Sequence, residues 1–363
     1  MSPNVDSDAS SNSDVNSNSD VSSSANSSAA AAREVCVTAS SRLHFGLFSF
    51  GGEGVQFGGA GVMIARPITR LRAVPSDNFM AWGPAAERVA DFAAEWMAYQ
   101  REKASRRDWV ASLAPELPAV RFDIESVAPS HVGLGSGTQL ALAVAACLEL
   151  LCGGGELPGP DELAASVGRG RRSAIGTYGF CQGGLLVDDG KVEPGRLATL
   201  AARVALPAEW RFVLVRPGTG VGLHGPDEIR AFQTLPPVSR ETSDELRRQV
   251  RERLLPAARA ADYDQFCASL YQFGHDAGMC FAAAQGGPYN GAVLSRLVQR
   301  MRELGMHGVG QSSWGPTLFA VAADERQAEE WVGRLEAEST DAPLEVCVAA
   351  PDNQGASVWR SWA

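Results

Sequence analysis

A glycine- and serine-rich loop occupies residues 129–139, between a strand-like run at 120–124 and an apolar helical run at 140–151. The first N–H groups of a helix have no partner within the helix and lie at the positive end of its dipole. Glycine also lets the backbone approach a ligand closely. The pattern therefore predicts a phosphate site; the alternative is a helix start that merely needs Gly and Ser. The residues expected to contact the ligand are His131, Gly133, Gly135, Ser136, Gly137, Thr138 and Gln139.

A basic cluster follows at Arg169, Arg171 and Arg172. Guanidinium groups bind phosphate or carboxylate in a bidentate manner. A solvated basic turn is the alternative, but a basic cluster in a chain of net charge −10, together with a glycine loop, favours an anion site. We expect Arg171 and Arg172 to act in catalysis and Arg169 to bind substrate. The residues expected in the same site are Ser173, Gly176 and Thr177.

Two more candidates lie near the start of the ordered sequence. Arg42 and His44 alternate with apolar residues, and alternate residues of a strand share one face. If the apolar residues point into the core, Arg42 and His44 point into a site, where we expect both to be catalytic. A structural histidine is the alternative. His224 follows a glycine-rich turn and is expected to contact substrate.

The composition limits the classes of function to which these residues can belong. A chain of 363 residues predicts two domains, and its acidic balance argues against a role on nucleic acid or a membrane surface. Residues 1–32 contain no aromatic or basic residue and predict a disordered tail without a signal peptide. No apolar run is long enough to span a membrane. Seven scattered cysteines predict free thiols in a reducing cytoplasm.

Periodicity predicts the elements that must position the site. Strands are expected at 34–39, 62–65, 69–74, 120–124, 184–188, 212–215, 318–322 and 344–349, and helices at 85–103, 140–151, 241–261, 263–284, 293–304 and 325–337. Pro67 is expected to separate two strands, Asp161 to cap a helix, residues 173–179 to form a loop, and Asp188-Asp189 to form a turn. Residues 285–289 either line a substrate pocket or end a helix.

Three segments, in order, resemble the motifs of the GHMP kinase superfamily, which is named for galactokinase, homoserine, mevalonate and phosphomevalonate kinases. Residues 40–46 resemble its opening strand, with Ser41 in place of the usual glycine. Residues 129–139 resemble its phosphate loop, and residues 308–316 resemble the C-terminal loop that closes against the phosphates in that family. The resemblance implies that the substrate contacts include Ser41, Gly310, Gln311, Ser312, Ser313 and Gly315.

The resemblance also implies the fold. We expect an α+β, GHMP-kinase-like fold with an N-terminal β-α-β domain like ribosomal protein S5, with a left-handed type of crossover. A ferredoxin-like α+β domain is expected to follow it. The expected boundaries are 1–32 for the tail, 33–204 for the phosphate-loop domain and 205–363 for the second domain.

One detail differs from a kinase. Many GHMP kinases carry a catalytic Asp after a Ser-Gly-Ile run, and the matching position here is Gly176, which has no carboxylate to serve as a base. The full set of motifs is similar to the β-ribofuranosylaminobenzene 5'-phosphate synthase family, whose members share the fold without being kinases. That resemblance implies a pentosyltransferase in methanopterin-type cofactor biosynthesis. An ATP-dependent small-molecule kinase is the alternative.

The resemblance implies the partners as well. Such an enzyme condenses phosphoribosyl pyrophosphate with 4-aminobenzoate or 4-hydroxybenzoate and releases CO₂ and pyrophosphate. Pyrophosphate can hold Mg²⁺ with few protein ligands, so Mg²⁺ is expected without an assigned protein site. ATP binding, the choice between the two benzoates, and a homodimer are left open.

Overall fold

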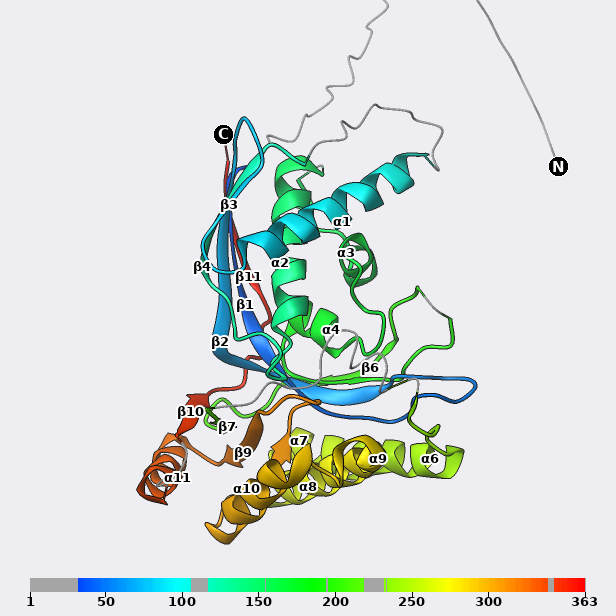
Figure 1. Cartoon of the computed structure of the whole chain (residues 1–363), viewed down its shortest axis with the longest axis vertical. Coiled ribbons are helices and arrows are strands. Elements are labelled where there is room, and N and C mark those ends of the chain that lie inside the picture. Colours follow the sequence, from blue (N-terminus) through cyan, green and yellow to red (C-terminus); the bar gives the residue numbers. More distant parts are fainter. Residues whose placement is uncertain are drawn as a thin grey trace, which may run out of the picture.

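The computed structural model describes residues 32–105, 117–153, 155–193, 195–218, 232, 234–338 and 343–362. The predicted tail at 1–31 and the candidate His224 lie outside the described residues. The fold is built on two sheets, each covered by helices (Figure 1).

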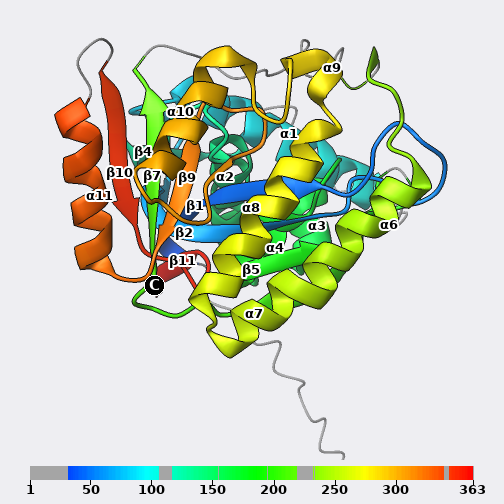
Figure 2. The ribbon, with the colours of Figure 1, turned by 90° about the horizontal axis from the view of Figure 1, so that it is seen from below.

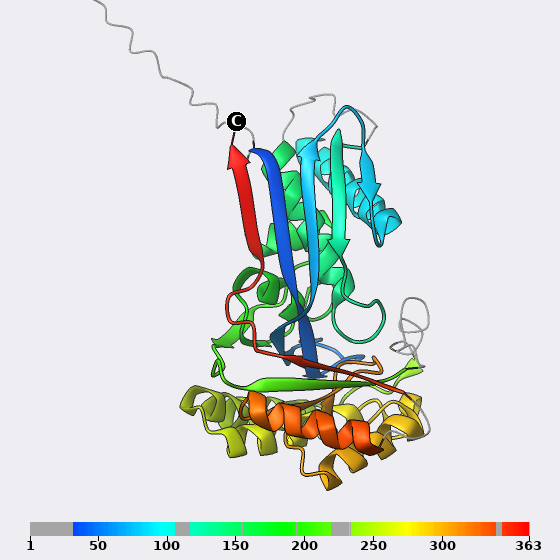
Figure 3. The same ribbon diagram turned by 90° about the vertical axis from the view of Figure 1, so that its left-hand side faces the viewer.

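The first sheet has seven strands in the order β11-β1-β2-β4-β3, with β5 paired to β2 and β6 paired to β5. Their bounds are β1 Ala32–Leu47, β2 Gly59–Pro75, β3 Met80–Trp82, β4 Val120–Ser126, β5 Leu185–Asp188, β6 Leu200–Val204 and β11 Ser357–Trp362. Strand β1 pairs antiparallel with both β2 and β11. The last strand of the chain therefore returns to the sheet of the first, as Figure 3 shows.

Four helices cover one face of this sheet (Figures 1 and 3). They are α1 Ala86–Ser105, α2 Ser136–Cys152, α3 Pro160–Ser166 and α4 Ile175–Gln182. Helix α2 is apolar around most of its circumference and is almost wholly buried, because it packs on β1 and also against α1, α3 and α4. It is therefore the central helix of the first layer.

The second sheet has four strands in the order β10-β7-β9-β8. These are β7 Arg211–Pro217, β8 Gly310–Gln311, β9 Leu318–Ala322 and β10 Leu344–Ala349. The helices of this half are α6 Arg240–Gln249, the π-helical turn η1 Val250–Leu254, α7 Leu255–Ala260, α8 Tyr263–Met279, α9 Ala282–Gln285, α10 Gly291–Glu303 and α11 Glu325–Glu338. Seen from below, they form the outer layer under both sheets (Figure 2).

The two halves share one core cluster. It joins Leu43 and Phe45 of β1 to Phe212 of β7, Phe273 of α8 and Phe319 of β9. A Cβ added at Gly46 would lie 2.4 Å from the Cβ of Ala277, so β1 and α8 approach so closely that only glycine fits there. Because one cluster spans both sheets, the halves pack as a continuous interior.

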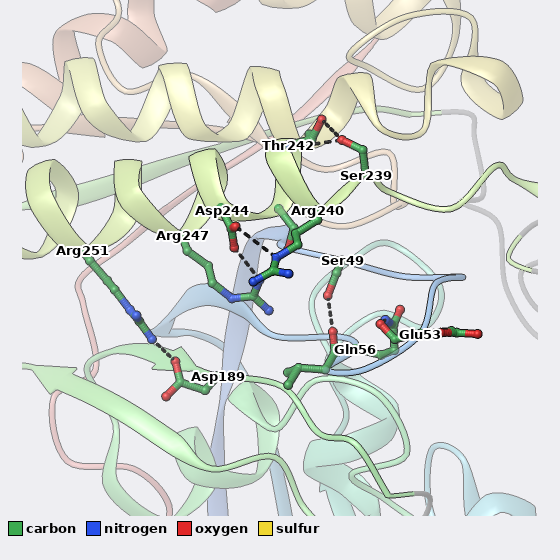
Figure 4. A network of polar contacts seen from close by, with 12 residues as sticks. Ser49, Glu53, Gln56, Asp189, Ser239, Arg240, Thr242, Asp244, Arg247 and Arg251 are labelled. Atoms are coloured by element: carbon green, nitrogen blue, oxygen red, sulfur yellow. Dashed lines mark hydrogen bonds and ion pairs between the residues drawn. The ribbon is translucent and has the colours of Figure 1, made fainter.

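Polar contacts also tie the halves together outside the core. Figure 4 shows Arg251 of η1 reaching Asp189, just beyond β5, with an N–O distance of 2.6 Å. One turn earlier, the guanidinium of Arg247 lies 5.5 Å from the ring centre of Phe48. Both arginines lie on the side of the α6–η1 segment that faces the first domain, and they fix that segment beside the hairpin that follows β1.

The structure corrects four local expectations. Strand β2 runs through Pro67 without ending. Helix α3 has Gly159 at its N-cap and Pro160 at its first position, so Asp161 lies inside the first turn and is not the cap. Residues 175–182, expected mainly as loop, form helix α4. Asp188 ends a strand and is fully buried, where a turn was expected.

Candidate functional site

A cavity of about 770 Å³ lies between β1, the 168–177 segment, helix α8 and the C-terminal loop. Eleven of the predicted site residues line it: Arg42, His44, Thr138, Arg169, Arg171, Arg172, Ser173, Gly176, Thr177, Gln311 and Ser313. They come from four separate parts of the chain. The fold therefore brings together most of the candidate side chains in one concave site, as binding sites for small molecules require.

Strand β1 supplies one wall. Arg42 and His44 both line the cavity, while Leu43 between them is fully buried in the core. Arg42, Leu43 and His44 thus follow the expected alternation, although Phe45 also lines the cavity; the catalytic roles of Arg42 and His44 stay predictions. The Arg42 guanidinium also donates to the carbonyl oxygen of Gly133 at 3.4 Å, so it lies against the glycine loop at the edge of the cavity.

The imidazole of His44 is buried and neutral. Burial, followed by repulsion from Arg42, lowers its pKa from 6.5 to about 3. Its Nε2 atom is buried and has no hydrogen-bond partner among the described residues. A neutral imidazole keeps one donor and one acceptor, so His44 can bind a polar group of a ligand but does not serve as a cation at neutral pH.

The N-terminus of α4 forms the second wall. Asp188 accepts hydrogen bonds from the Ser173 hydroxyl and the Ala174 N–H, both at 2.8 Å, and from the Gly190 N–H at 3.0 Å. Burial raises the pKa of Asp188 to about 6, although these hydrogen bonds act to lower it. Asp188 thus fixes the turn that carries the arginine cluster into α4, a role that the sequence did not reveal.

Within the arginine cluster, Arg169 lies in a partly dehydrated environment, whereas Arg171 is exposed. The Arg169 guanidinium lies 4.8 Å from the ring centre of Phe92 in α1, and Arg88 lies 6.0 Å from the same ring. Burial lowers the pKa of Arg169, and the nearby charges of Arg88 and Arg171 lower it further, while Glu95 opposes them. A partly dehydrated guanidinium close to other cations, as Arg169 is, favours binding of an anion.

The glycine loop and the C-terminal loop are bound to each other. Ser312 is fully buried, and its hydroxyl donates to the Gly133 carbonyl at 2.7 Å and accepts from the His44 N–H at 3.0 Å. Gly135 has φ 71 and is the N-cap of α2; a Cβ there would lie 2.6 Å from Cγ of Arg42. Left-handed geometry and close approach both require glycine at this position.

Several candidates therefore do not line the cavity. Ser41 is buried and donates to the carbonyl of Pro67, and Gln139 donates to the carbonyl of Gly176 at 2.9 Å. The other candidates outside the cavity lining are His131, Gly133, Gly135, Ser136, Gly137, Gly310, Ser312 and Gly315. They lie in different surroundings: His131 is exposed, Gly310 belongs to β8, and Ser136 and Ser312 are buried.

An aromatic wall completes the cavity. It consists of Phe57, Phe232, Phe281 and Trp314, and Trp314 stacks on Phe232 with ring centres 4.9 Å apart. The sequence analysis did not single out these rings, which are far apart in the chain and have no motif of their own. Gln285 and Pro288 also line the cavity, which favours the pocket interpretation of residues 285–289.

The site offers few ligands for a metal. Among the described residues, no group of three or more His, Cys, Asp or Glu side chains could hold a metal ion. Glu95 is the one carboxylate in the described lining of the cavity. In the described part of the chain, no helix has the length and apolarity needed to cross a bilayer.

Comparison with known proteins agrees with this geometry. The family model "GHMP kinases N terminal domain" matches residues 97–183, and "GHMP kinases C terminal" matches residues 254–339. A protein of Archaeoglobus fulgidus named beta-ribofuranosylphenol 5'-phosphate synthase is 30% identical over 296 residues, which cover 77% of this chain and 85% of that protein. The chain belongs to the beta-ribofuranosylphenol 5'-phosphate synthase family. The family member of Methanothermobacter thermautotrophicus is 28% identical over 79% of this chain and 88% of its own length.

Solved structures establish the fold. A homoserine kinase from Cytophaga hutchinsonii aligns with a TM-score of 0.61 at 13% identity, covering 90% of this chain and 98% of the kinase. A mevalonate diphosphate decarboxylase from Staphylococcus aureus aligns with a TM-score of 0.55 at 14% identity and the same coverages. The predicted GHMP-kinase-like α+β fold is confirmed. The prediction of a pentosyltransferase built on this fold is confirmed as well, because the chain belongs to the beta-ribofuranosylphenol 5'-phosphate synthase family.

Proposed function

We propose that the chain joins phosphoribosyl pyrophosphate to a 4-substituted benzoate, with loss of CO₂ and pyrophosphate, to give a C-riboside 5'-phosphate. The observation that carries this proposal is that one cavity is lined both by arginine side chains and by aromatic rings, which meet where the Arg172 guanidinium lies 4.8 Å from the ring centre of Phe232. The relatives are named for a ribofuranosylphenol 5'-phosphate. A phenol product is what 4-hydroxybenzoate would give as the acceptor, so the name supports this choice. We place the reaction in the cytoplasm, which suits the free cysteines of the chain.

The arginine side chains suit the donor. Phosphoribosyl pyrophosphate carries a 5'-phosphate and a pyrophosphate, and both need dehydrated cations or helix N-termini. Arg169, Arg171 and Arg172 line the cavity beside the N-terminus of α4, where the buried Thr177 hydroxyl has no partner among the described residues. We assign Arg171 and Arg172 to the leaving pyrophosphate.

The reaction needs no general base. The bond between ribose C1 and the pyrophosphate oxygen breaks, and the electron pair leaves with pyrophosphate. The ring carbon that bears the carboxylate then bonds to C1. The bond from that carbon to the carboxylate breaks next, its electrons restore the aromatic ring, and CO₂ departs. Cations that stabilise the leaving pyrophosphate therefore provide the main catalytic effect.

Arg42 and His44 suit the benzoate carboxylate. The guanidinium can hold the carboxylate until CO₂ forms, and the neutral imidazole can donate one hydrogen bond beside it. Neither residue needs to accept a proton from the substrate. Their task is to orient the ring carbon toward ribose C1, which is the part of the barrier that positioning removes.

Mg²⁺ fits this site as a companion of the donor. It would bind mainly to pyrophosphate oxygens and water, with Glu95 as the carboxylate available from the cavity lining. When bound, it would neutralise part of the pyrophosphate charge. We propose no dedicated protein cage for it.

The kinase alternative has weaker support. Gly176 lines the cavity at the position where many GHMP kinases carry a catalytic Asp, and a Cβ there would lie 3.1 Å from Cγ2 of Thr138. An added carboxylate would therefore crowd α2 and place a negative charge beside the arginines. Gly176→Asp is expected to slow the synthase reaction without creating a kinase.

The test uses pure protein, Mg²⁺, phosphoribosyl pyrophosphate and carboxyl-labelled 4-hydroxybenzoate or 4-aminobenzoate. We expect labelled CO₂ and pyrophosphate in equal amounts, dependent on the donor. Release of no CO₂ from either benzoate, with phosphorylation of an alcohol from ATP, would replace this proposal with the kinase alternative.

A further inference from the structure

Two buried polar groups on the aromatic side of the cavity have no hydrogen-bond partner in the part of the chain that the structure describes. Gln285 and Trp314 both line the cavity and are 7% and 5% exposed. Among the described residues, neither Oε1 of Gln285 nor Nε1 of Trp314 has a hydrogen-bond partner. A buried polar group without a partner is unfavourable, so a pair of them in one binding cavity indicates a polar ligand group.

The amide of Gln285 has a fixed orientation. Its Nε2 donates to the carbonyl oxygens of Gly278 and Gly287, both at 3.0 Å. Rotating the amide by half a turn would place Oε1 against those two carbonyl oxygens and lose both hydrogen bonds. Both donors of the Gln285 amide are therefore used, and Oε1 is the atom left to pair with a ligand group.

Trp314 presents only a donor. An indole N–H cannot accept a hydrogen bond, and the ring is held by Phe232 on one face and by Phe281, whose ring centre is 5.0 Å away at an interplanar angle of 85°. Phe281 also accepts the backbone N–H of Gln285 at 3.1 Å. The acceptor and the donor thus belong to one packed cluster.

We propose that Gln285 and Trp314 read the para substituent of the benzoate and select a hydroxyl over an amino group. This inference rests on the proposed function. A phenol hydroxyl donates to Gln285 Oε1 and accepts from Trp314 Nε1 at once. An aniline nitrogen donates but is a poor acceptor, because its lone pair is delocalised into the ring, so the Trp314 N–H would stay without a partner. Sites built to pair with a hydroxyl discriminate strongly against analogues that leave their groups unpaired.

The opposite end of the acceptor agrees with this placement. The Ser313 N–H donates to the carbonyl of His44 at 3.0 Å, so the loop that carries Trp314 is attached to the strand that carries Arg42 and His44. The residues assigned to the carboxylate and the residue assigned to the para group are therefore joined through the 313–314 segment.

The test compares wild type with Trp314→Phe, which removes the N–H but keeps a ring for Phe232. Trp82→Phe, at a residue 57% exposed and outside the cavity lining, is the matched control. We measure kcat/KM for 4-hydroxybenzoate and 4-aminobenzoate, with riboside formation followed by chromatography. Wild type and the control are expected to prefer 4-hydroxybenzoate at least tenfold. In Trp314→Phe, kcat/KM for 4-hydroxybenzoate should fall about tenfold, while that for 4-aminobenzoate stays within twofold.

A second variant, Gln285→Met, removes the acceptor and should lower kcat/KM for both acceptors, since both donate to Oε1. Melting temperatures show whether each variant is folded. If Gln285→Met does not fold, Trp314→Phe alone decides the proposal. Equal use of the two benzoates by wild type, or an equal loss for both in Trp314→Phe, would overturn this inference and leave the proposed function intact. Failure of wild type to release CO₂ from either benzoate would overturn both.

Discussion

The hydroxyl of Ser312 donates a 2.7 Å hydrogen bond to the carbonyl oxygen of Gly133, 179 residues away in the chain. The same hydroxyl accepts the N–H of His44, so one buried side chain joins the glycine loop, the C-terminal loop and strand β1. The relative position of the walls of the cavity depends on this junction.

Ser312→Ala is expected to lower the free energy of unfolding by about 1–3 kcal/mol, because it leaves the buried His44 N–H without its partner and the Gly133 carbonyl with only the 3.4 Å hydrogen bond from Arg42. Urea unfolding measures the change. Ser76→Ala is the control, since its hydroxyl bonds at an exposed site and should change stability by less than about 0.5 kcal/mol. Equal stability of the two variants would contradict the claim that Ser312 joins the two loops and β1.

Gly135→Val should weaken binding of phosphoribosyl pyrophosphate at least tenfold while the protein stays folded. The valine would adopt an unfavourable φ and displace Arg42 from the edge of the cavity. Gly155→Val tests the backbone effect alone, because Gly155 has φ 82 and a Cβ there would meet nothing within 4 Å. Titration calorimetry with both variants separates the two effects, and equal donor affinity would argue against the loop's role.

Replacing Arg171 and Arg172 together by Ala should reduce kcat by about 10²–10³-fold, since transition-state charge on pyrophosphate would lose its cations. The control is Arg240→Ala, because the Arg240 side chain is 96% exposed on α6. A near wild-type kcat for the double variant would show that Arg171 and Arg172 do not stabilise the leaving pyrophosphate.

Asp188 gives a prediction on pH. Its pKa rises from 3.8 to about 6 on folding, so the folded state holds this proton more tightly than the unfolded state. Protonated Asp188 therefore adds to the free energy of unfolding below pH 3.8, and this contribution is lost as the pH rises to about 6. At about 1.4 kcal/mol per pKa unit, the change amounts to about 3 kcal/mol. Asp188→Asn should flatten the dependence of unfolding free energy on pH between pH 4 and 6. An unchanged slope in urea titrations would show that Asp188 titrates normally.

Much of the site follows from local sequence rules. Alternation in β1 predicted that Arg42 and His44 share one face. The glycines at 133 and 135 predicted the loop that begins α2, and both have positive φ in the structure. These features depend on residues within a few positions of each other, which is why the sequence alone could predict them.

The remainder depends on contacts between distant segments. Asp188 has the local signature of a turn, and only the packing of α4 against β5 buries it. The aromatic wall combines rings from four regions that share no period. Pairing of β11 with β1 joins the two ends of the described chain, and no local pattern encodes that choice.

The central claim is that a carbon–carbon bond replaces the carboxylate. We would incubate the protein with phosphoribosyl pyrophosphate labelled with ¹³C at ribose C1 and 4-hydroxybenzoate labelled with ¹³C at the ring carbon that bears the carboxylate, and record the ¹³C spectrum of the product. The account predicts a one-bond coupling between the two labelled carbons and no carboxylate in the product. A product that keeps its carboxylate, or that shows no such coupling, would contradict it.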